Sequence, residues 1–442
     1  MISRRGRELG FLVPAAVLGA VGAGAVASAR ADALELGPLP GVLAMTGVFL
    51  ALHLVLRWRA PLADPYLLPV VGALTALGLV ELERIDPGLA RDQLVWVGVG
   101  ALVFTAVVVL LRDHRVLERY RYLIGLGGVL LLVVTMAVGT TINGSKLWIE
   151  VGGGQTVQLG ELSKVMIVVF LAGYLRDKRE VLAIPTTRHL GIALPAARHF
   201  GPVLVVWGAA LVALVVMNDF GTALLFFGAF LAMIYLATGR LAYAGVGLGL
   251  FAAGAAAVYA FVPRIADRVD AWLHPFDDPQ GRGYQLVQSL YALGDGGMLG
   301  PGLGKGFLVN QDGTTVVPAL ETDFIFTAVA SEIGYLGGVA VLLLFLVLVQ
   351  RGFSIAIGAT DGFSKLLAGG LTTVLALQAF LIVGGVIRLV PLTGVTLPFM
   401  SYGGSSVVVN FGLVALLLLV SQRSREHALV AAAPPRRGEG RA

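Results

Sequence analysis

Three carboxylates stand at or near the start of one apolar segment, in the stretch VPALETDFIFTAVASEIGYLGG at residues 317–338. Asp323 directly precedes the apolar run, where water would meet lipid if the run spans a membrane. A carboxylate in that position can act as a general base, or it can hold a divalent cation such as Mg²⁺ or Mn²⁺. It can equally belong to a helix start, with Thr322 as the cap and Asp323 in the first turn. The residues leave both interpretations open.

A second group of ionisable residues lies in QLGELSKVMIVVFLAGYL, residues 158–175. Glu161 and Lys164 are three residues apart, so a helix would place them on one face, with Lys164 inside the apolar run. They form either a salt bridge that neutralises both charges or the lining of a polar cavity where Lys164 meets a phosphate, and these interpretations are compatible. Asp219, between two apolar runs, is either a helix cap or part of the same cavity.

The stretch HPFDDPQGRGYQLVQSLYALGDGGMLGPGLGKG, residues 274–306, combines amphipathic and glycine-rich sequence. Gln285, Gln288 and Ser289 share one helical face opposite leucines, which is typical of a short helix in the membrane interface. Arg282, Lys305 and the N–H groups of the glycine run could bind a phosphate. The run is not a nucleotide P-loop, because a glycine follows Lys305 and the glycine spacing fails. A plain loop is the alternative.

The composition restricts the class of protein that carries these residues. The chain has 442 residues, of which 57% are hydrophobic and only 13% charged, against about 25% charged in soluble domains. It contains no Cys and no HExxH or GxSxG motif, so thiol, zinc-hydrolase and serine-hydrolase chemistry have no basis. The net charge of +5 is scattered over short loops, which argues against nucleic acid as a partner. The chain reads as an all-α polytopic membrane protein.

Apolar runs of roughly 20 residues predict about twelve transmembrane helices. Their ranges are 10–29, 38–57, 66–83, 93–111, 122–140, 160–175, 201–217, 221–239, 242–262, 324–349, 366–387 and 404–421. Most Lys and Arg residues fall in alternate loops and in both terminal segments, which predicts that both termini are cytoplasmic.

The loops on the opposite side include a long segment, 263–323, and two shorter ones, 141–159 and 388–406. Loops of such length are usually functional. The predicted organisation is a two-helix N-terminal extension (1–60), a membrane domain (61–422) with the long loop outside, and a disordered basic cytoplasmic tail (423–442).

Several stretches, in this order, resemble the SEDS family (shape, elongation, division and sporulation), of which RodA and FtsW are members. They are NGSKLWI (143–149), QLGELSK (158–164), NDFGTA (218–223), DPQGRGYQLVQSL (278–290), GGMLGPGLGKG (296–306), ETDFIFTAVASEIG (321–334) and PLTGVTLPFMSYGGSS (391–406). The chain departs from the family pattern at four places: Leu159 and Gly160 replace Pro-Ser, Asn218 replaces Pro, and Ser331 replaces an acid.

The resemblance implies a ten-helix core with two added N-terminal helices. It also implies a peptidoglycan glycosyltransferase that polymerises lipid II at the outer face of the bacterial cytoplasmic membrane, beside a class B penicillin-binding protein. The family's essential aspartate corresponds to Asp323, its acid–lysine pair to Glu161 and Lys164, and its loop tryptophan to Trp148. Further substrate-binding candidates within the matching stretches are Lys146, Asp219, Arg282, Gln285, Gln288, Lys305, Ser401 and Ser405.

Polymerisation of lipid II requires a base near the acceptor hydroxyl, and cations or a divalent metal at the departing pyrophosphate. The energy resides in the substrate, so no nucleotide is expected. Two other classes remain open: a transporter that flips lipid-linked sugars, and a non-catalytic membrane scaffold for a penicillin-binding protein. The sequence does not distinguish elongation, division and sporulation roles.

Overall fold

A computed structural model describes residues 3–31, 39–142, 144–152, 155–183, 187–189, 192–194, 201–310 and 314–432. Each of the predicted spans coincides with a helix. These helices are α1 (Arg4–Ala31), α2 (Leu39–Arg59), α3 (Leu67–Ile85), α4 (Pro87–Leu110), α6 (Arg121–Val138), α7 (Leu159–Ala183), α8 (Gly201–Val216), α9 (Phe220–Thr238), α10 (Leu241–Phe261), α13 (Ile325–Gly358), α14 (Gly362–Val386) and α15 (Gly404–Ala432). The all-α polytopic prediction is confirmed.

The count of twelve membrane spans is not confirmed. Within the described residues, nine helices are long and apolar enough to cross a membrane, and α3, α7 and α8 are not among them. Ionisable residues interrupt the apolar character of α3 and α7, and the apolar part of α8 is only Leu204–Val216. The helix α15 continues to Ala432, so residues 423–432, predicted as tail, are helical. Residues 433–442 of that tail lie outside the described residues.

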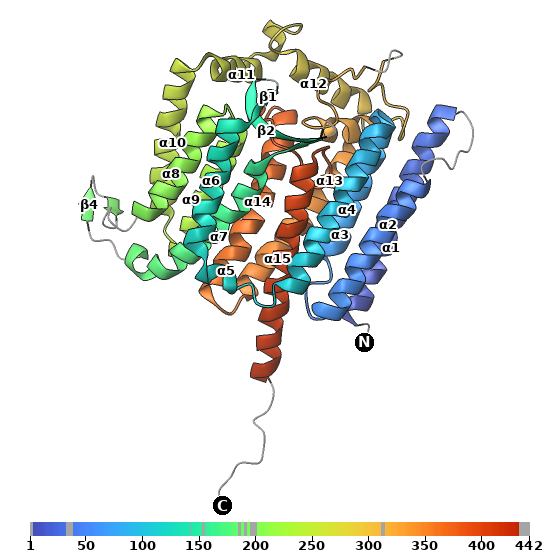
Figure 1. The fold of residues 1–442 in the computed structure, drawn as a ribbon. Helices are drawn as coiled ribbons and strands as arrows, with labels where there is room; N and C mark the ends of the chain where they lie inside the picture. The colour runs from blue at the N-terminus through green and yellow to red at the C-terminus, as the bar shows by residue number, and fades with distance from the viewer. Residues whose placement is uncertain are drawn as a thin grey trace, which may run out of the picture.

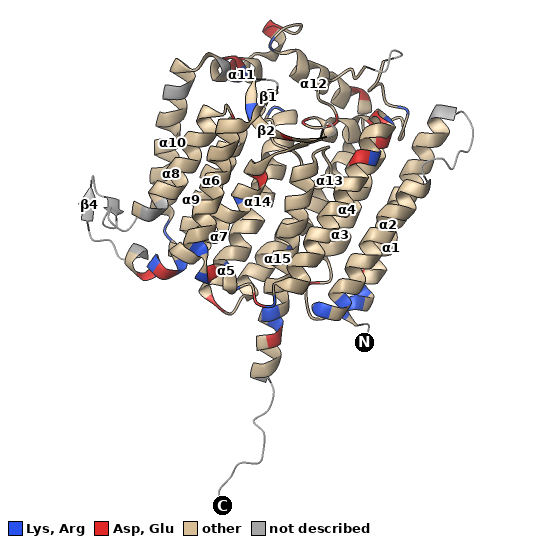
Figure 2. Cartoon of the chain, in the orientation of Figure 1, with Lys and Arg blue, Asp and Glu red and all other residues tan. Residues whose placement is uncertain are grey.

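The helices run side by side, with α11 (Pro263–Leu273) and α12 (Tyr284–Gly296) across one end, and the start of α1 and the end of α15 at the other (Figure 1). Most charged residues gather at these two ends, while the middle is almost free of them (Figure 2). The most enclosed helix is α14, which packs against α7, α9 and α13. Of the N-terminal helices, α1 packs on α3 and α2 on α4.

The remaining elements are short. They are the helix α5 (Val116–Arg119), a 3₁₀ turn (Pro275–Asp277), an antiparallel sheet of β1 (Thr140–Ile142), β2 (Ser145–Gly152) and β3 (Gln155–Val157), and a separate hairpin of β4 (Thr187–His189) and β5 (Ile192–Leu194). The first sheet occupies the predicted 141–159 loop and pairs Thr140 with Trp148.

The helix α13 is broken at Gly334, whose φ is 74°. The glycine-rich loop after α12 fills the break: Gly297 accepts a hydrogen bond from the Tyr335 amide at 2.8 Å, and Gly302 donates to the Glu332 carbonyl at 2.9 Å. A Cβ at Gly300 would lie 2.1 Å from the same carbonyl oxygen, so only glycine allows this approach. The span predicted at 324–349 is therefore two helical segments joined at a glycine.

Candidate functional site

Asp323 lies in a tight turn directly before α13. The turn runs through Ala319, which has a positive φ of 58°, and the amides of Asp323 and Phe324 donate to the Ala319 carbonyl. Phe324 is the N-cap of α13, without a side-chain cap bond, and no acidic residue stands in the first helical turn. The helix-start interpretation of Thr322 and Asp323 is therefore wrong, because the turn ends before the helix begins.

The turn is held in place by the loop between α14 and α15. Ser401 donates to the Thr322 carbonyl at 2.5 Å, and the Tyr402 amide donates to the Glu321 carbonyl at 2.8 Å. Gln93 of α4 in turn donates to the Ser401 carbonyl at 2.9 Å. The buried Ser401, predicted as a substrate contact, thus fixes the backbone that carries Asp323.

The same loop links Asp323 to the start of α9. A Cβ placed at Gly394 would lie 3.7 Å from an Asp323 carboxylate oxygen, and one at Gly221 would lie 2.3 Å from the Thr393 carbonyl oxygen. Asp219 is the N-cap of α9 and accepts a 3.0 Å hydrogen bond from the Thr222 amide. The cap interpretation of Asp219 is confirmed, and the close backbone packing brings this cap towards Asp323.

A basic residue that the sequence did not single out affects both of these acids. Arg268 lies on α11 and lowers the pKa of both Asp219 and Asp323, so its charge reaches both carboxylates. The helix α11 is anchored by Trp272, which donates to the Arg388 carbonyl at 3.1 Å, while Arg388 donates back to the Trp272 carbonyl at 2.8 Å. Pro263 at the first helical position is the sequence signal that could have located α11.

The Asp323 side chain is half-buried, and loss of water around it dominates its electrostatics. This loss raises the pKa of the carboxyl from 3.8 to about 6, against the lowering effects of a Thr322 hydrogen bond and of Arg268, while Glu321 raises it further. A carboxylate with that pKa is ionised at neutral pH yet basic enough to accept a proton.

Asp219 has a similar environment at the neighbouring helix start. Burial raises its pKa, the hydrogen bonds from Thr222 lower it, and the negative charge of Glu161 raises it. The charges of Glu161 and Arg268 therefore both affect the Asp219 carboxyl, and that of Arg268 affects Asp323 as well.

Glu161 and Lys164 form the predicted salt bridge. The Lys164 ammonium donates to a Glu161 carboxylate oxygen at 2.7 Å, and both side chains are buried, Lys164 to 1% exposure. The start of α7 is fixed to α15 by Ser405, whose hydroxyl accepts a 2.8 Å hydrogen bond from the Gln158 amide. Ser405, like Ser401, thus positions an element that carries an ionisable residue.

The two candidates of the β-sheet lie beside the same helix ends. Lys146 donates from its ammonium to the Ala137 carbonyl at 3.1 Å and from its amide to the Met217 carbonyl at 3.1 Å. Trp148 is half-buried, and its carbonyl accepts a 3.0 Å hydrogen bond from Thr140. The Lys146 amide therefore binds the backbone two residues before Asp219 in the chain.

The glycine run that was predicted to bind a phosphate already binds a carboxylate of the protein. The amides of Gly304 and Gly306 donate to the Glu332 carboxylate at 2.7 and 3.2 Å, and Arg84 donates to it at 3.1 Å. These N–H groups are not available to a phosphate, which corrects that interpretation of the glycine run. The side chain of Lys305 is exposed.

The other loop candidates point outward. Arg282 is about half exposed and contacts Asp267 at 3.1 Å, Asp270 at 3.5 Å and Asp278 at 3.8 Å. On α12, Gln285 is exposed and Gln288 half-buried.

Ser289 corrects the predicted polar face of α12. It is buried and lies 2.7 Å from the Thr327 hydroxyl of α13. This helix therefore packs on α13 through that face.

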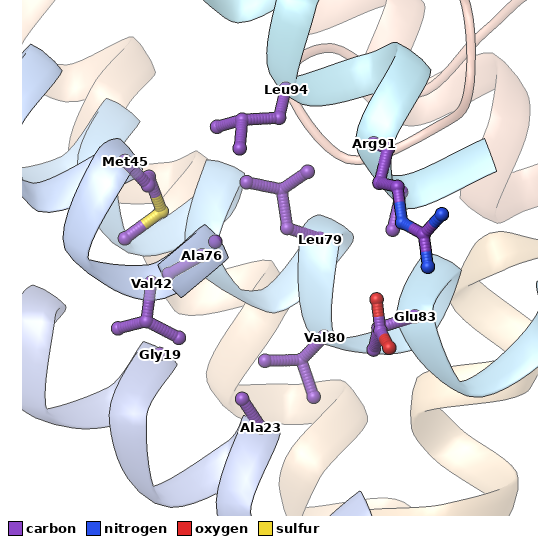
Figure 3. A pocket seen from close by; sticks show the side chains of 12 residues that line it. Gly19, Ala23, Val42, Met45, Ala76, Leu79, Val80, Glu83, Arg91 and Leu94 are labelled. Carbon is purple, nitrogen blue, oxygen red and sulfur yellow. The ribbon is translucent and has the colours of Figure 1, made fainter. Parts of the chain in front are cut away.

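Two further observations concern metal binding and cavities. Within the described part of the chain, no group of three or more His, Cys, Asp or Glu residues could hold a metal ion. A cavity of about 70 Å³ between α1, α2, α3 and α4 is lined mainly by apolar side chains, with Glu83 and Arg91 facing one another at one side (Figure 3). It lies in the N-terminal part and away from Asp323, so the candidate site is the cluster around Asp323, Arg268, Asp219 and the Glu161–Lys164 pair.

Comparison with known proteins identifies the family of the chain. The profile of a family described as "Cell cycle protein" (FtsW, RodA, SpoVE) matches residues 66–426. The peptidoglycan glycosyltransferase RodA of Mycobacterium bovis is 42% identical over 397 residues, covering 87% of this chain and 83% of the relative. Stage V sporulation protein E of Bacillus subtilis is 34% identical, covering 76% and 87%.

Two solved structures resemble the fold. A chain of a peptidoglycan synthase complex that coordinates polymerization and crosslinking matches with a TM-score of 0.66 and 27% identity, covering 82% of this chain and 98% of the other. The rod shape determining protein RodA of Thermus thermophilus matches with a TM-score of 0.59 and 26% identity, covering 83% and 98%. Both coverages show that the likeness extends over nearly all of the known fold.

Proposed function

The chain belongs to the FtsW, RodA and SpoVE family of cell cycle proteins, and on that premise we propose that it polymerises lipid II with Asp323 as the catalytic carboxylate. Membership of this family makes the chain a peptidoglycan glycosyltransferase and a multi-pass protein of the bacterial inner membrane. The proposal adds the substrate, the side of the membrane and the residues that act.

The observation that carries the proposal is the state of the Asp323 carboxylate. It is not a helix cap, and burial raises its pKa to about 6. Loss of water around a carboxylate destabilises the fold, so such a residue needs an explanation. Strongly perturbed groups beside a cluster of charges are candidates for catalysis. The rigid turn that carries it, tied to Ser401 and Tyr402, suits a base that must be held in one position.

In the proposed reaction, Asp323 accepts the proton of the acceptor sugar hydroxyl as the oxygen attacks the anomeric carbon of the donor lipid II. A new glycosidic bond forms, and the bond to the undecaprenyl pyrophosphate breaks. Arg268 and Lys164 are the cations that can stabilise the negative charge of the departing pyrophosphate. Asp219 and Glu161 keep these cations in place through their own negative charge.

A divalent cation at this site would be shared between Asp323 and the substrate. Asp323 can supply one or two oxygens, and the remaining ligands of Mg²⁺ or Mn²⁺ would be pyrophosphate oxygens and water. The cation would then neutralise the leaving group, a role that Arg268 could fill in part.

We further propose that both termini are cytoplasmic and that the end with α11 and α12 faces outward, where a class B penicillin-binding protein would bind. The chain lacks Cys, so single cysteines can report on topology. Leu299 and Leu429 are exposed at opposite ends, at 73% and 59%. A membrane-impermeant maleimide should label Leu299→Cys but not Leu429→Cys in intact cells, and the reverse pattern would overturn the orientation.

The proposal is tested by incubating the purified protein with lipid II, with and without its cognate transpeptidase, and resolving glycan chains on a gel. Chains longer than the disaccharide are expected. A lipid-linked sugar transporter is the second candidate, because charged residues inside a bundle also suit transport. That candidate predicts movement of labelled lipid II across a proteoliposome bilayer with no polymer formed.

A further inference from the structure

A polar groove at the end of the molecule opposite Asp323 has no part in the proposed reaction. It lies between α13 and α15, has a volume of about 210 Å³, and is closed on one side by the loop before α3. The two helices contribute matching positions, Arg351, Ser354, Ile355 and Gly358 from α13 and Ser421, Ser424, Arg425 and Ala428 from α15. This end also carries the start of α1 and the end of α15 (Figure 1), and the charge pattern predicts that it is cytoplasmic.

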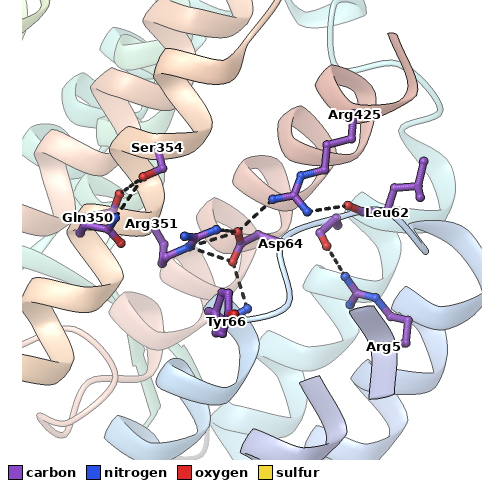
Figure 4. Close-up of polar contacts among 9 residues, drawn as sticks. Arg5, Leu62, Asp64, Tyr66, Gln350, Arg351, Ser354 and Arg425 are labelled. Atoms are coloured by element: carbon purple, nitrogen blue, oxygen red, sulfur yellow. Dashed lines mark hydrogen bonds and ion pairs between the residues drawn. The ribbon is translucent and has the colours of Figure 1, made fainter. Parts of the chain in front are cut away.

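The charge in the groove is positive. Arg351 and Arg425 both bind the buried Asp64, Arg351 at 3.2 Å through Nε and Arg425 at 3.4 Å through Nη2 (Figure 4). Two guanidinium groups against one carboxylate leave a net charge of +1. Asp64 also accepts the Tyr66 amide at 3.0 Å, and Arg425 donates to the Leu62 carbonyl at 3.3 Å. These bonds use only part of the N–H donors that two guanidinium groups carry, so donors remain for a further acceptor.

A buried hydroxyl adds a donor to this site. Ser421 is only 2% exposed and lines the groove, and its hydroxyl has no hydrogen-bond partner among the described residues. Ser354 and Ser424 donate instead to the Gln350 and Val420 carbonyls of their own helices, both within 2.9 Å. A buried hydroxyl without a partner is unfavourable, and it is satisfied if the groove binds a polar ligand.

The mouth of the groove is formed by small residues. Gly358 and Ala428 are both exposed, and a Cβ added at Gly358 would meet no atom within 4 Å. A ligand can therefore enter at the end of the helices and reach Arg425 about one turn inside and Arg351 about two turns inside. Surplus guanidinium donors, an unpaired hydroxyl and an open mouth together match an oxyanion with several acceptor oxygens.

We propose that this groove binds a phosphate group, as the headgroup of an anionic phospholipid or as a free phosphate. Basic pockets between membrane helices on the cytoplasmic side commonly bind anionic headgroups. The bound phosphate would bridge Arg351 and Arg425 and accept from Ser421, joining α13, whose other end follows the Asp323 turn, to α15.

The test uses the purified full-length protein in phosphatidylcholine nanodiscs, with the thermal unfolding midpoint followed by tryptophan fluorescence. In one arm phosphatidylglycerol replaces a third of the lipid, and in the other inorganic phosphate replaces chloride at equal ionic strength. A bound ligand raises the midpoint by mass action. A rise of several degrees with phosphatidylglycerol identifies a headgroup site, and a rise with inorganic phosphate identifies a soluble ligand.

Three variants and one control separate the groove from general charge attraction. Gly358→Leu fills the mouth and should lose most of the rise, while Gly47→Leu, at an exposed helical glycine with open space around it, should keep it. Arg425→Gln should reduce the rise. Asp64→Asn removes the competing carboxylate and should increase it, whereas a purely structural ion cluster predicts no increase.

The proposal is overturned if neither arm shifts the wild-type midpoint. It is equally overturned if Gly358→Leu and Arg425→Gln respond as the wild type does, or if Asp64→Asn shows no larger rise than the wild type.

Discussion

Asp323 lies just before α13 and Glu332 in its first segment, and the two acids differ in how many protein donors they bind. Glu332 is completely buried and receives hydrogen bonds from Arg84, Gly304 and Gly306. Asp323 stands in a turn before the helix, and burial raises its pKa to about 6. One carboxylate has its acceptor capacity filled by the protein, and the other is kept basic.

The difference separates structural acids from reactive ones. A carboxylate that accepts hydrogen bonds from several protein N–H groups in place of water holds segments together, here the break of α13 and the glycine loop. A carboxylate that has lost water and gained fewer donors, such as Asp323 with its Thr322 hydrogen bond, is destabilised in its charged form until it takes a proton or a cation. Substitutions at the two positions should therefore affect different properties.

Loss of the filled carboxylate should have the largest effect on stability. Glu332→Ala removes the carboxylate that Arg84, whose side chain is 15% exposed, contacts at 3.1 Å, and it leaves two glycine amides without that acceptor. Removing one partner of a buried ion pair typically costs about 3–5 kcal/mol. Thermal unfolding of the purified variant should show a strongly lowered midpoint, and a midpoint equal to that of the wild type would remove Glu332 from the structural class.

The Glu161–Lys164 pair shares features of both cases, since its two charges are paired within the protein and it belongs to the candidate site. Glu161→Ala or Lys164→Ala leaves a charge in a buried position, so each should lower stability by several kcal/mol in principle, and less if water enters. The double variant should be more stable than the worse single variant. If it is not, the salt-bridge account fails, and a direct phosphate role for Lys164 gains support.

The pH dependence should report Asp323. Its base form is lost as pH falls through about 6, so the polymerisation rate should drop about tenfold per pH unit below that value. Stability should respond in the opposite direction. Because the folded pKa lies above the ordinary 3.8, the group's contribution to stability is fully present below 3.8 and is lost as pH rises through about 6.

A rate that stays constant from pH 7 to pH 5 would show that no group with such a pKa controls the reaction. Continuous measurement of lipid II consumption in buffers of equal ionic strength supplies this profile.

The smallest effect is expected at Glu321. Its carbonyl, which accepts the Tyr402 amide, remains in Glu321→Gln, and only the repulsion that raises the pKa of Asp323 is removed. The pH at which the polymerisation rate begins to fall should move slightly lower, and the rate at neutral pH should change by no more than a few-fold. A loss as large as that of an Asp323 variant would place the base at Glu321.

The sequence predicted what depends on local pattern. Apolar runs located each long helix, and the spacing of Glu161 and Lys164 predicted their pairing. The resemblance selected Asp323 and the ionisable neighbours. These features depend on residues close together in the chain.

What was missed depends on contacts between distant segments. Arg84 and Glu332 are 248 residues apart, so no local pattern indicates that Glu332 occupies the glycine amides. The start of α13 was misjudged because the turn is set by a hydrogen bond from Ser401, 79 residues away. Arg268 was overlooked because α11 resembles an ordinary charged loop until its anchor at Arg388 is seen.

The most direct test compares Asp323→Asn with the wild type in two measurements on one preparation, glycan synthesis from lipid II and thermal unfolding. Asn keeps the size and the turn but removes the charge and the basicity. The account predicts that polymer formation falls by orders of magnitude, with the cognate transpeptidase and a divalent cation present, while the unfolding midpoint at pH 7 does not fall. Polymer formation at the wild-type rate by a folded Asp323→Asn protein would contradict it.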